Sequence, residues 1–96
     1  MSYTDFLRED RRLVLLRILS DLPAYRSNSS VLAAALHQLG HVASRDQVAA
    51  DLHWLGEQGL LTVEDHEAVL VVTLTERGAD VAAGRAIVPG VRRPSA

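Results

Sequence analysis

Apolar residues follow a helical period in the N-terminal part of the chain and an alternating, β-rich pattern farther on. The first helical stretch begins near Ser2 or Thr4 and ends before Pro23, because the residue that precedes a proline is pushed out of the helical region. A polar connector over residues 25–30 leads to a second helical stretch that ends at Gly40. The apolar positions of this second helix are Val31, Leu32, Ala35, Leu36 and Leu39.

A third helix is predicted to begin a few residues after the second one ends. Ser44 and Gln47 have the S-x-x-Q spacing of a capping box, in which each side chain satisfies a backbone N–H group of the first turn. The apolar stripe of this helix consists of Val48, Leu52 and Leu55. Trp54 lies beside the stripe, where we expect a core or interface anchor, and Gly59 closes the helix. Two helices joined by a short turn that contains glycine are typical of a helix-turn-helix.

The pattern after the third helix predicts a β-hairpin. Residues 60–64 and 68–73 are β-rich, and they flank a polar tip at residues 65–67 with the sequence Asp-His-Glu. An isolated hairpin is marginal in water, so one face of it must be covered by the helices.

Thr73 and Glu76 match a T-x-x-E capping box and predict a short last helix that stops near Gly84. Residues 87–96 are basic and show no apolar pattern, so we expect a flexible tail behind a single domain of residues 1–86. The order helix, helix, turn, helix, hairpin, helix predicts a mainly α fold with a small β-hairpin, that of a winged helix-turn-helix domain.

The composition is that of one globular domain. The chain has 96 residues, of which 48% are hydrophobic and 23% are charged. It contains no cysteine, which excludes disulfides and thiolate metal sites. No apolar run approaches the roughly 20 residues that cross a bilayer, and no signal-peptide pattern opens the chain. We therefore expect a cytoplasmic protein without a membrane partner.

Two segments resemble the ArsR/MarR-like winged-helix regulators of prokaryotes. Residues 44–60, with the sequence S-R-D-Q-V-A-A-D-L-H-W-L-G-E-Q-G-L, look like the recognition helix that leads into the wing, and residues 74–78 are similar to the L-T-x-x-G segment that follows the wing. More narrowly, residues 3–12 and 88–91 are similar to a small protein of Mu-like phages and prophages that is labelled an ArsR-like regulator. The resemblance implies a sequence-specific, DNA-binding transcription regulator of phage or prophage type, with the third helix in a major groove.

The outward positions at the head of the third helix are the predicted base contacts. They are Ser44, Arg45, Gln47, Ala49, Ala50 and His53. Arg45 suits a guanine and Gln47 an adenine, each pairing being worth about 1 to 3 kcal/mol of discrimination. An alternative stays open for these two residues, in which Gln47 caps its own helix and Arg45 is a solvated side chain. Contacts to phosphates are expected from Arg26, Arg92 and Arg93.

The charge of the chain favours a second hypothesis. Its formal net charge is −2, whereas DNA affinity comes mainly from Lys and Arg residues that neutralise phosphates. The predicted wing tip is acidic, and Ala50 and Asp51 stand where many members of the family have a basic residue. The alternative is a winged-helix protein-interaction module that does not bind DNA.

The DNA-binding hypothesis includes a homodimer that forms through the first helix and the segment from Leu74 onward.

Three other patterns of the sequence bear on metal binding, surface charge and catalysis. His37 and His41 have a four-residue spacing, but Gly40 should break the helix between them and no third ligand stands nearby, so we expect no metal and no cofactor. The basic residues of the first helix either form a basic spot or, as we favour, a ladder of surface ion pairs; the residues are Arg8, Arg11 and Arg12 against Asp5, Glu9 and Asp10. No nucleophile elbow, phosphate loop or paired-carboxylate site is apparent, so we expect no enzymatic activity.

Overall fold

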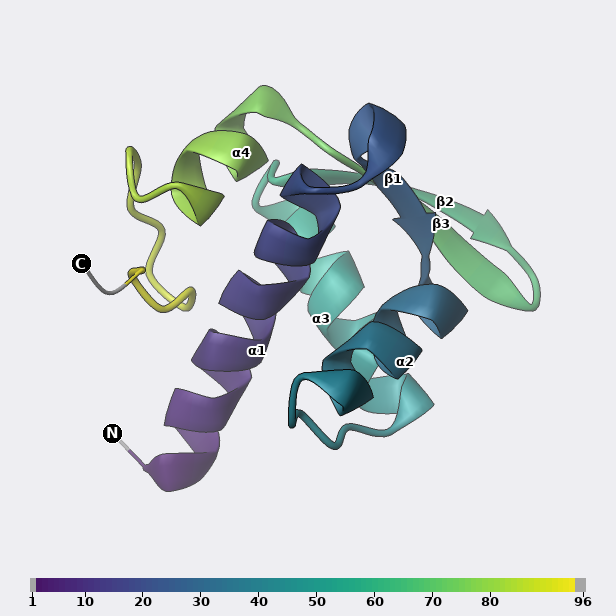
Figure 1. Cartoon of the computed structure of the whole chain (residues 1–96), viewed down its shortest axis with the longest axis horizontal. Helices are drawn as coiled ribbons and strands as arrows, with labels where there is room; N and C mark the ends of the chain where they lie inside the picture. Colours follow the sequence, from purple (N-terminus) through teal and green to yellow (C-terminus); the bar gives the residue numbers. More distant parts are fainter. Residues whose placement is uncertain (1, 95–96) are drawn as a thin grey trace.

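The structure is a computed structural model that describes residues 2–94, and within them it has four α-helices, a short 3₁₀ helix and one three-stranded antiparallel sheet (Figure 1). The elements in chain order are α1 Tyr3–Ser20, η1 Pro23–Tyr25, β1 Arg26–Asn28, α2 Ser29–Gln38, α3 Arg45–Glu57, β2 Leu61–His66, β3 Val69–Leu74 and α4 Glu76–Ala82. The predicted helices and the predicted hairpin are present, in an α+β arrangement in which helices dominate.

Polar caps determine where α1 and α3 begin. The Ser2 side chain accepts a hydrogen bond from the backbone N of Asp5 at 3.1 Å. At α3 both halves of the predicted capping box are formed, since Ser44 Oγ accepts from Gln47 N at 3.1 Å and Gln47 Oε1 accepts from Ser44 N at 2.9 Å. These bonds satisfy N–H groups of the first turn that have no partner inside the helix.

The cap of α4 lies two residues later than predicted. Thr73, the predicted cap, belongs to β3 and pairs with Thr62 of β2. Thr75 caps α4 instead, because its Oγ1 accepts a hydrogen bond from Gly78 N at 3.0 Å and donates one to Gly59 O at 2.8 Å. The capping-box prediction at Thr73 was wrong because that residue is already paired in the sheet.

The polar connector contains a strand that the sequence pattern does not reveal. β1 pairs antiparallel with β3, with Arg26 opposite Thr73, and the strand order is β1-β3-β2. Asn28 ends the strand and caps α2, since its Oδ1 accepts a hydrogen bond from Val31 N at 2.9 Å. A strand of only three polar residues carries no β-rich alternation, so pairing with the central strand is what identifies it.

The hairpin turn is tighter than predicted. β2 and β3 stay paired as far as His66 and Val69. Asp65 and His66, which the pattern assigns to the tip, are therefore strand residues, and Glu67 and Ala68 form the turn. Glu67 adopts a positive φ of 59° there, as tight hairpin turns require.

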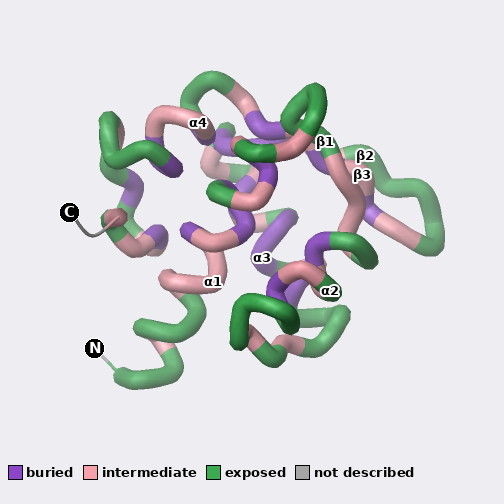
Figure 2. Tube along the Cα trace, viewed as in Figure 1, coloured by how far each residue is buried: buried purple, intermediate pink, exposed green. Residues whose placement is uncertain are grey.

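The core lies between the helices and one face of the sheet (Figure 2). The predicted stripe of α3, made of Val48, Leu52 and Leu55, is fully buried, as expected. Phe6 and Leu7 stay 40% and 36% exposed, although the helical period places them on the apolar face of α1. Figure 2 shows the reason, because the N-terminal turns of α1 extend beyond the body of the molecule.

Residues 87–94 pack onto the domain instead of extending from it as a tail. Val88 and Val91 are only 4% and 6% exposed and belong to the core. The backbone N of Arg92 donates a hydrogen bond to Glu9 O at 3.2 Å. The expected boundary at residue 86 was wrong because two valines in a short segment give no detectable period. Ser95 and Ala96, which the prediction included in the tail, lie outside the described residues, as does Met1.

Candidate nucleic-acid interface

The head of α3 presents the predicted contact residues to the outside. Ser44, Arg45, Gln47, Ala50 and His53 are exposed, and Ala49 is half-buried. Their orientation follows from the opposite stripe of the helix, which is buried in the core. Within the described part of the chain, Arg45 has no hydrogen-bond or ion-pair partner. Its guanidinium is therefore available to a ligand.

Gln47 has a structural role in addition to its exposed position. Its Oε1 accepts the hydrogen bond from Ser44 N that completes the capping box. The carbonyl oxygen is thus used within the helix, and the amide NH₂ group is what remains for an outside partner. The capping alternative left open by the sequence is realised for Gln47.

A groove of about 390 Å³ separates α3 from the hairpin, and its charge is mainly negative. Three predicted contact residues, Arg45, Ala49 and His53, line its α3 side. The carboxylates that line it are Asp46, Asp65 and Glu67. Phosphates in this groove would meet more carboxylates than guanidinium groups, which is unfavourable for DNA.

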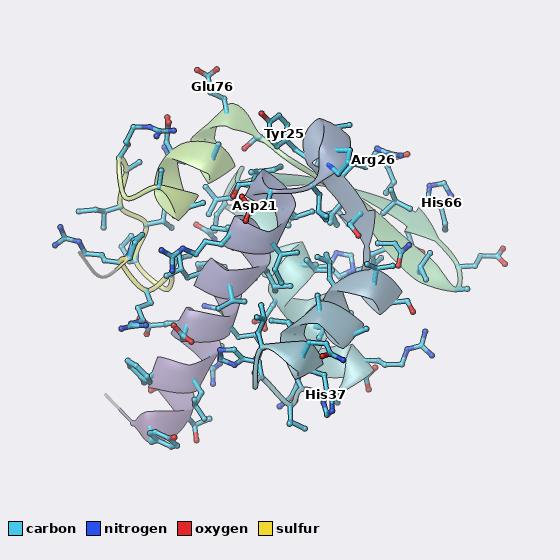
Figure 3. All side chains as sticks on the ribbon, in the orientation of Figure 1. Asp21, Tyr25, Arg26, His37, His66 and Glu76 are labelled. Carbon is cyan, nitrogen blue, oxygen red and sulfur yellow. The ribbon has the colours of Figure 1, made fainter. Side chains whose placement is uncertain are left out.

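Arg26 is close to the hairpin, but its guanidinium is already paired. Its Nη1 donates to Glu64 Oε2 at 2.9 Å and to Thr73 Oγ1 at 3.0 Å. The hydrogen bond from Arg26 holds the pKa of Glu64 below its ordinary value. Figure 3 shows Arg26 on the same side of the molecule as His66 of the hairpin. Because both partners of this ion pair are about half exposed, a phosphate could displace Glu64 at small cost.

Arg92 and Arg93 do not join the head of α3. They lie in the C-terminal segment, which Figure 1 shows on the opposite side of the molecule from the hairpin. The Nη1 of Arg92 donates to Asp10 Oδ1 at 2.8 Å, and its guanidinium lies 5.2 Å from the ring centre of Phe6. Arg93 is exposed. The structure therefore separates these two predicted phosphate contacts from the other candidate residues.

A buried charge cluster that the sequence interpretation missed connects α1 with α3. Asp51 is only 2% exposed and accepts hydrogen bonds from Arg11 Nε at 2.5 Å and Arg12 Nε at 3.1 Å. Arg12 also donates to Gly90 O at 3.0 Å and lies 3.9 Å from the ring centre of Trp54. The burial of Asp51 could have been inferred from the sequence, because position 51 lies on the same helical face as the buried stripe of α3.

The cluster overturns part of the predicted charge ladder on α1. Arg8 pairs with Asp5 at 3.5 Å, as expected. Arg11 and Arg12 bind Asp51 of α3 instead of their neighbours on α1. A ladder was predicted from spacing alone, and a carboxylate brought close by the fold is the better partner for both guanidinium groups.

His41 joins a second cluster that ties the α2–α3 connection to α1. His41 Nε2 lies 2.7 Å from Asp10 Oδ2, and Arg92 binds the other oxygen of the same carboxylate. Burial by itself would raise the pKa of Asp10, but the hydrogen bonds from Arg92 and His41 outweigh it and lower this pKa. His37 is exposed and lies apart from this cluster. Among residues 2–94, no three His, Cys, Asp or Glu side chains are grouped as metal ligands would be.

No helix in the described part of the chain has both the length and the apolar character needed to span a membrane.

Comparison with known proteins gives two relatives. The chain is 53% identical over 90 residues to the uncharacterized protein gp26 of Escherichia phage Mu, and the match covers 94% of this chain and 93% of that protein. It is 42% identical over 78 residues to an uncharacterized protein of Haemophilus influenzae (strain ATCC 51907 / DSM 11121 / KW20 / Rd), with 80% of this chain and 76% of the relative covered. No family model and no solved structure matches the chain.

Proposed function

The chain belongs to the family of phage Mu gp26, and on that premise we propose that it is a winged helix-turn-helix regulator that binds duplex DNA through the head of α3. In this proposal α2 and α3 form the helix-turn-helix, and the β2–β3 hairpin is the wing. The order of helices and strands and the strand order β1-β3-β2 support it. The protein is then a binding module and not an enzyme.

The observation that carries the proposal is the free guanidinium of Arg45. Arg45 is the first residue of α3, is exposed, and has no protein partner within residues 2–94. Ala49 and Ala50 follow on the outer side, where small side chains let a helix approach base edges closely. A bidentate bond from arginine to guanine is the commonest specific contact in a major groove.

The acidic hairpin restricts how a duplex can approach. Glu64, Asp65 and Glu67 are exposed on the hairpin and repel phosphates. The duplex therefore meets the head of α3, with the wing held away from the backbone. Because few phosphates are neutralised, we expect a shallow dependence of affinity on salt concentration.

A homodimer would present two copies of Arg45. The surface predicted for it, the first helix and the segment from Leu74 onward, contains a hollow of about 630 Å³ between the end of α1 and α4. The hollow is lined by two arginines, Arg17 and Arg85, and by Asp21 and Glu76, so that a two-fold axis can bring opposite charges together. Figure 3 shows Asp21, Tyr25 and Glu76 at this end of the molecule.

The test is DNA binding by fluorescence polarisation, using fragments from the protein's own genomic neighbourhood and a series of salt concentrations. Arg45→Ala should abolish specific binding, because it removes the free guanidinium at the head of α3. Arg77→Ala is the matched control, since Arg77 is an exposed arginine on α4 that lies away from the head of α3 and does not line the hollow between α1 and α4. Absence of specific binding at every salt concentration, or equal losses in both variants, would rule out the regulator.

The acidic groove favours a second candidate function, a protein-interaction module that binds a basic partner between α3 and the hairpin. Asp46, Asp65 and Glu67 line this groove. The double variant Asp65→Asn, Glu67→Gln distinguishes the two candidate functions, because its effect on affinity is opposite in the two cases. It should strengthen DNA binding by removing repulsion if the protein is the proposed regulator, and weaken partner binding if the groove holds a basic protein.

A further inference from the structure

A hollow of about 600 Å³ lies between the N-terminal half of α1 and α3, on the side of α3 away from the hairpin groove. Its apolar walls include Leu7 of α1, Val42 of the α2–α3 connection and Trp54 of α3. Val42 is 82% exposed and Leu7 is 36% exposed. Large apolar side chains left in water around one hollow are typical of a contact surface for another molecule.

The lining of this hollow contains three arginines and two carboxylates, namely Arg8, Arg11, Arg12, Asp51 and Glu57. Arg11 and Arg12 both line it and share a single carboxylate, that of Asp51. Arg11 binds Asp51 through Nε, and its two terminal nitrogens have no partner among residues 2–94. No fully buried side-chain nitrogen of residues 2–94 lacks a hydrogen bond, so these terminal nitrogens keep some contact with solvent, although the Arg11 side chain as a whole is only 12% exposed. They can donate to an incoming carboxylate.

We propose that this hollow, which we call the α1–α3 groove, binds an amphipathic helical segment of a partner protein that carries an acidic side chain beside a large apolar one. The apolar side chain packs on Leu7, Val42 and Trp54, and the carboxylate accepts hydrogen bonds from Arg11. Two helices form the walls, as in grooves that receive a third helix. A nucleic acid fits less well, because its phosphates would leave the apolar walls in water.

The proposal does not depend on DNA binding by α3. It does predict competition between the two ligands if both bind, because Gln47 and Ala50 line the α1–α3 groove as well as the head of α3. A partner segment in the groove would cover part of the surface that the duplex needs.

Trp54 gives a direct readout of occupancy, since it is the single tryptophan of the chain and lines the groove. The full chain is titrated with a synthetic amphipathic helical peptide that has leucine on one face and glutamate on the flanks. The matched peptide has lysine in place of every glutamate. We expect saturable changes in Trp54 fluorescence with the acidic peptide and about tenfold weaker binding of the basic one, because only a carboxylate complements Arg11.

Two surface variants locate the binding site. Val42→Ser removes an exposed apolar side chain without adding charge, and it should lower the affinity for the acidic peptide by about tenfold. Val31→Ser is the control, because Val31 is a 51% exposed valine on α2 that does not line the groove. Equal binding of the acidic and basic peptides, or equal losses in the two variants, would overturn the proposal. The proposal would also be overturned if Trp54 fluorescence responded to duplex DNA but to neither peptide, and if that response were the same in Val42→Ser. The groove would then bind phosphate.

Discussion

The buried carboxylate of Asp51 links α3 to α1 through two ion pairs. It lies on the core side of α3 and is nearly inaccessible, with Arg11 and Arg12 bound to its two oxygens. A buried carboxylate is tolerated when its lone pairs are filled by well-placed donors, and two guanidinium groups supply them here. The cluster holds α3 in one orientation relative to α1, and so it orients both the head of α3 and the α1–α3 groove.

We predict that Asp51→Ala lowers the free energy of unfolding by about 3 to 5 kcal/mol, because two mostly buried guanidinium groups lose their counter-charge. Urea denaturation followed by circular dichroism measures this change. Asp46→Ala is the control on the same helix, and since Asp46 is exposed it should cost about 1 kcal/mol or less. Similar losses in both variants would contradict the role assigned to Asp51.

Asp10 gives a pH dependence whose sign follows from its partners. Hydrogen bonds from Arg92 and His41 lower its pKa in the folded state despite burial. A lowered folded-state pKa stabilises the protein above the unfolded pKa, about 3.9 for aspartate, and this contribution is lost as the pH falls through the folded value.

We therefore expect the free energy of unfolding of the wild type to fall more steeply on acidification below about pH 4 than that of Asp10→Asn. Urea unfolding at a series of pH values between neutral and acid conditions measures the two slopes. Asp5→Asn serves as control, because Asp5 makes only an exposed ion pair with Arg8. If the slopes of the wild type and Asp10→Asn coincide, Asp10 is not the titrating group.

At the scale of the elements, α4 packs so closely against Leu60, the residue before β2, that position 78 must be a glycine. A Cβ atom at Gly78 would lie 2.1 Å from Leu60 O and 2.6 Å from Leu74 Cδ1. Gly78 is buried in the first turns of α4, so backbone atoms would have to move to make room. Alanine would favour the helix by about 1 kcal/mol in isolation, which is less than the cost of such overpacking.

Gly78→Ala should destabilise the protein by about 3 kcal/mol, the upper end for overpacking, since the nearest obstacle is a backbone oxygen. Thermal unfolding followed by circular dichroism provides the comparison. Gly40→Ala is the control, because no atom lies within 4 Å of the added carbon and only the positive φ of 88° is unfavourable there. That strain costs about 1 kcal/mol. A neutral Gly78→Ala would show that α4 can shift freely.

At the scale of the whole molecule, the proposed homodimer can be tested by a substitution in its expected contact surface. The lining of the hollow between the end of α1 and α4 includes several small residues beside the charged ones, among them the exposed Ala83. Ala83→Arg should convert a dimer into a monomer, because a long charged side chain would fill the hollow that the second copy needs. Light scattering after gel filtration measures the mass. Ala34→Arg, an exposed position on α2, should leave it unchanged. A monomeric wild type would remove the homodimer from the proposal.

Much of the local structure could be predicted because it is decided by residues close in sequence. The capping box of Ser44 and Gln47 joins residues three apart, and the helical period of α3 correctly identified its buried stripe. The exposure of Arg45 and Ala50 followed from the same period. These features depend on backbone hydrogen bonds and side-chain spacing within one or two helical turns.

The failed predictions involve residues far apart in the chain. Arg12 meets Gly90 and Arg92 meets Asp10 across most of the chain, so neither pair has a pattern that a period can detect. The capping-box prediction at Thr73 failed because the pairing of Thr73 in the sheet is not evident from its neighbours in the sequence. Each of these contacts is formed by packing between segments that are distant in the sequence.

The sequence by itself determined the helices, the capping box of α3, the hairpin and the outward face of α3, since turn chemistry and hydrophobic period act over a few residues. Only the tertiary structure decided which charges are free. It bound Arg26, Arg92, Arg11 and Arg12 to carboxylates and left Arg45 without a protein partner in the described chain. Ion pairs form between whichever groups packing brings within a few ångströms, and that distance is not encoded in local spacing.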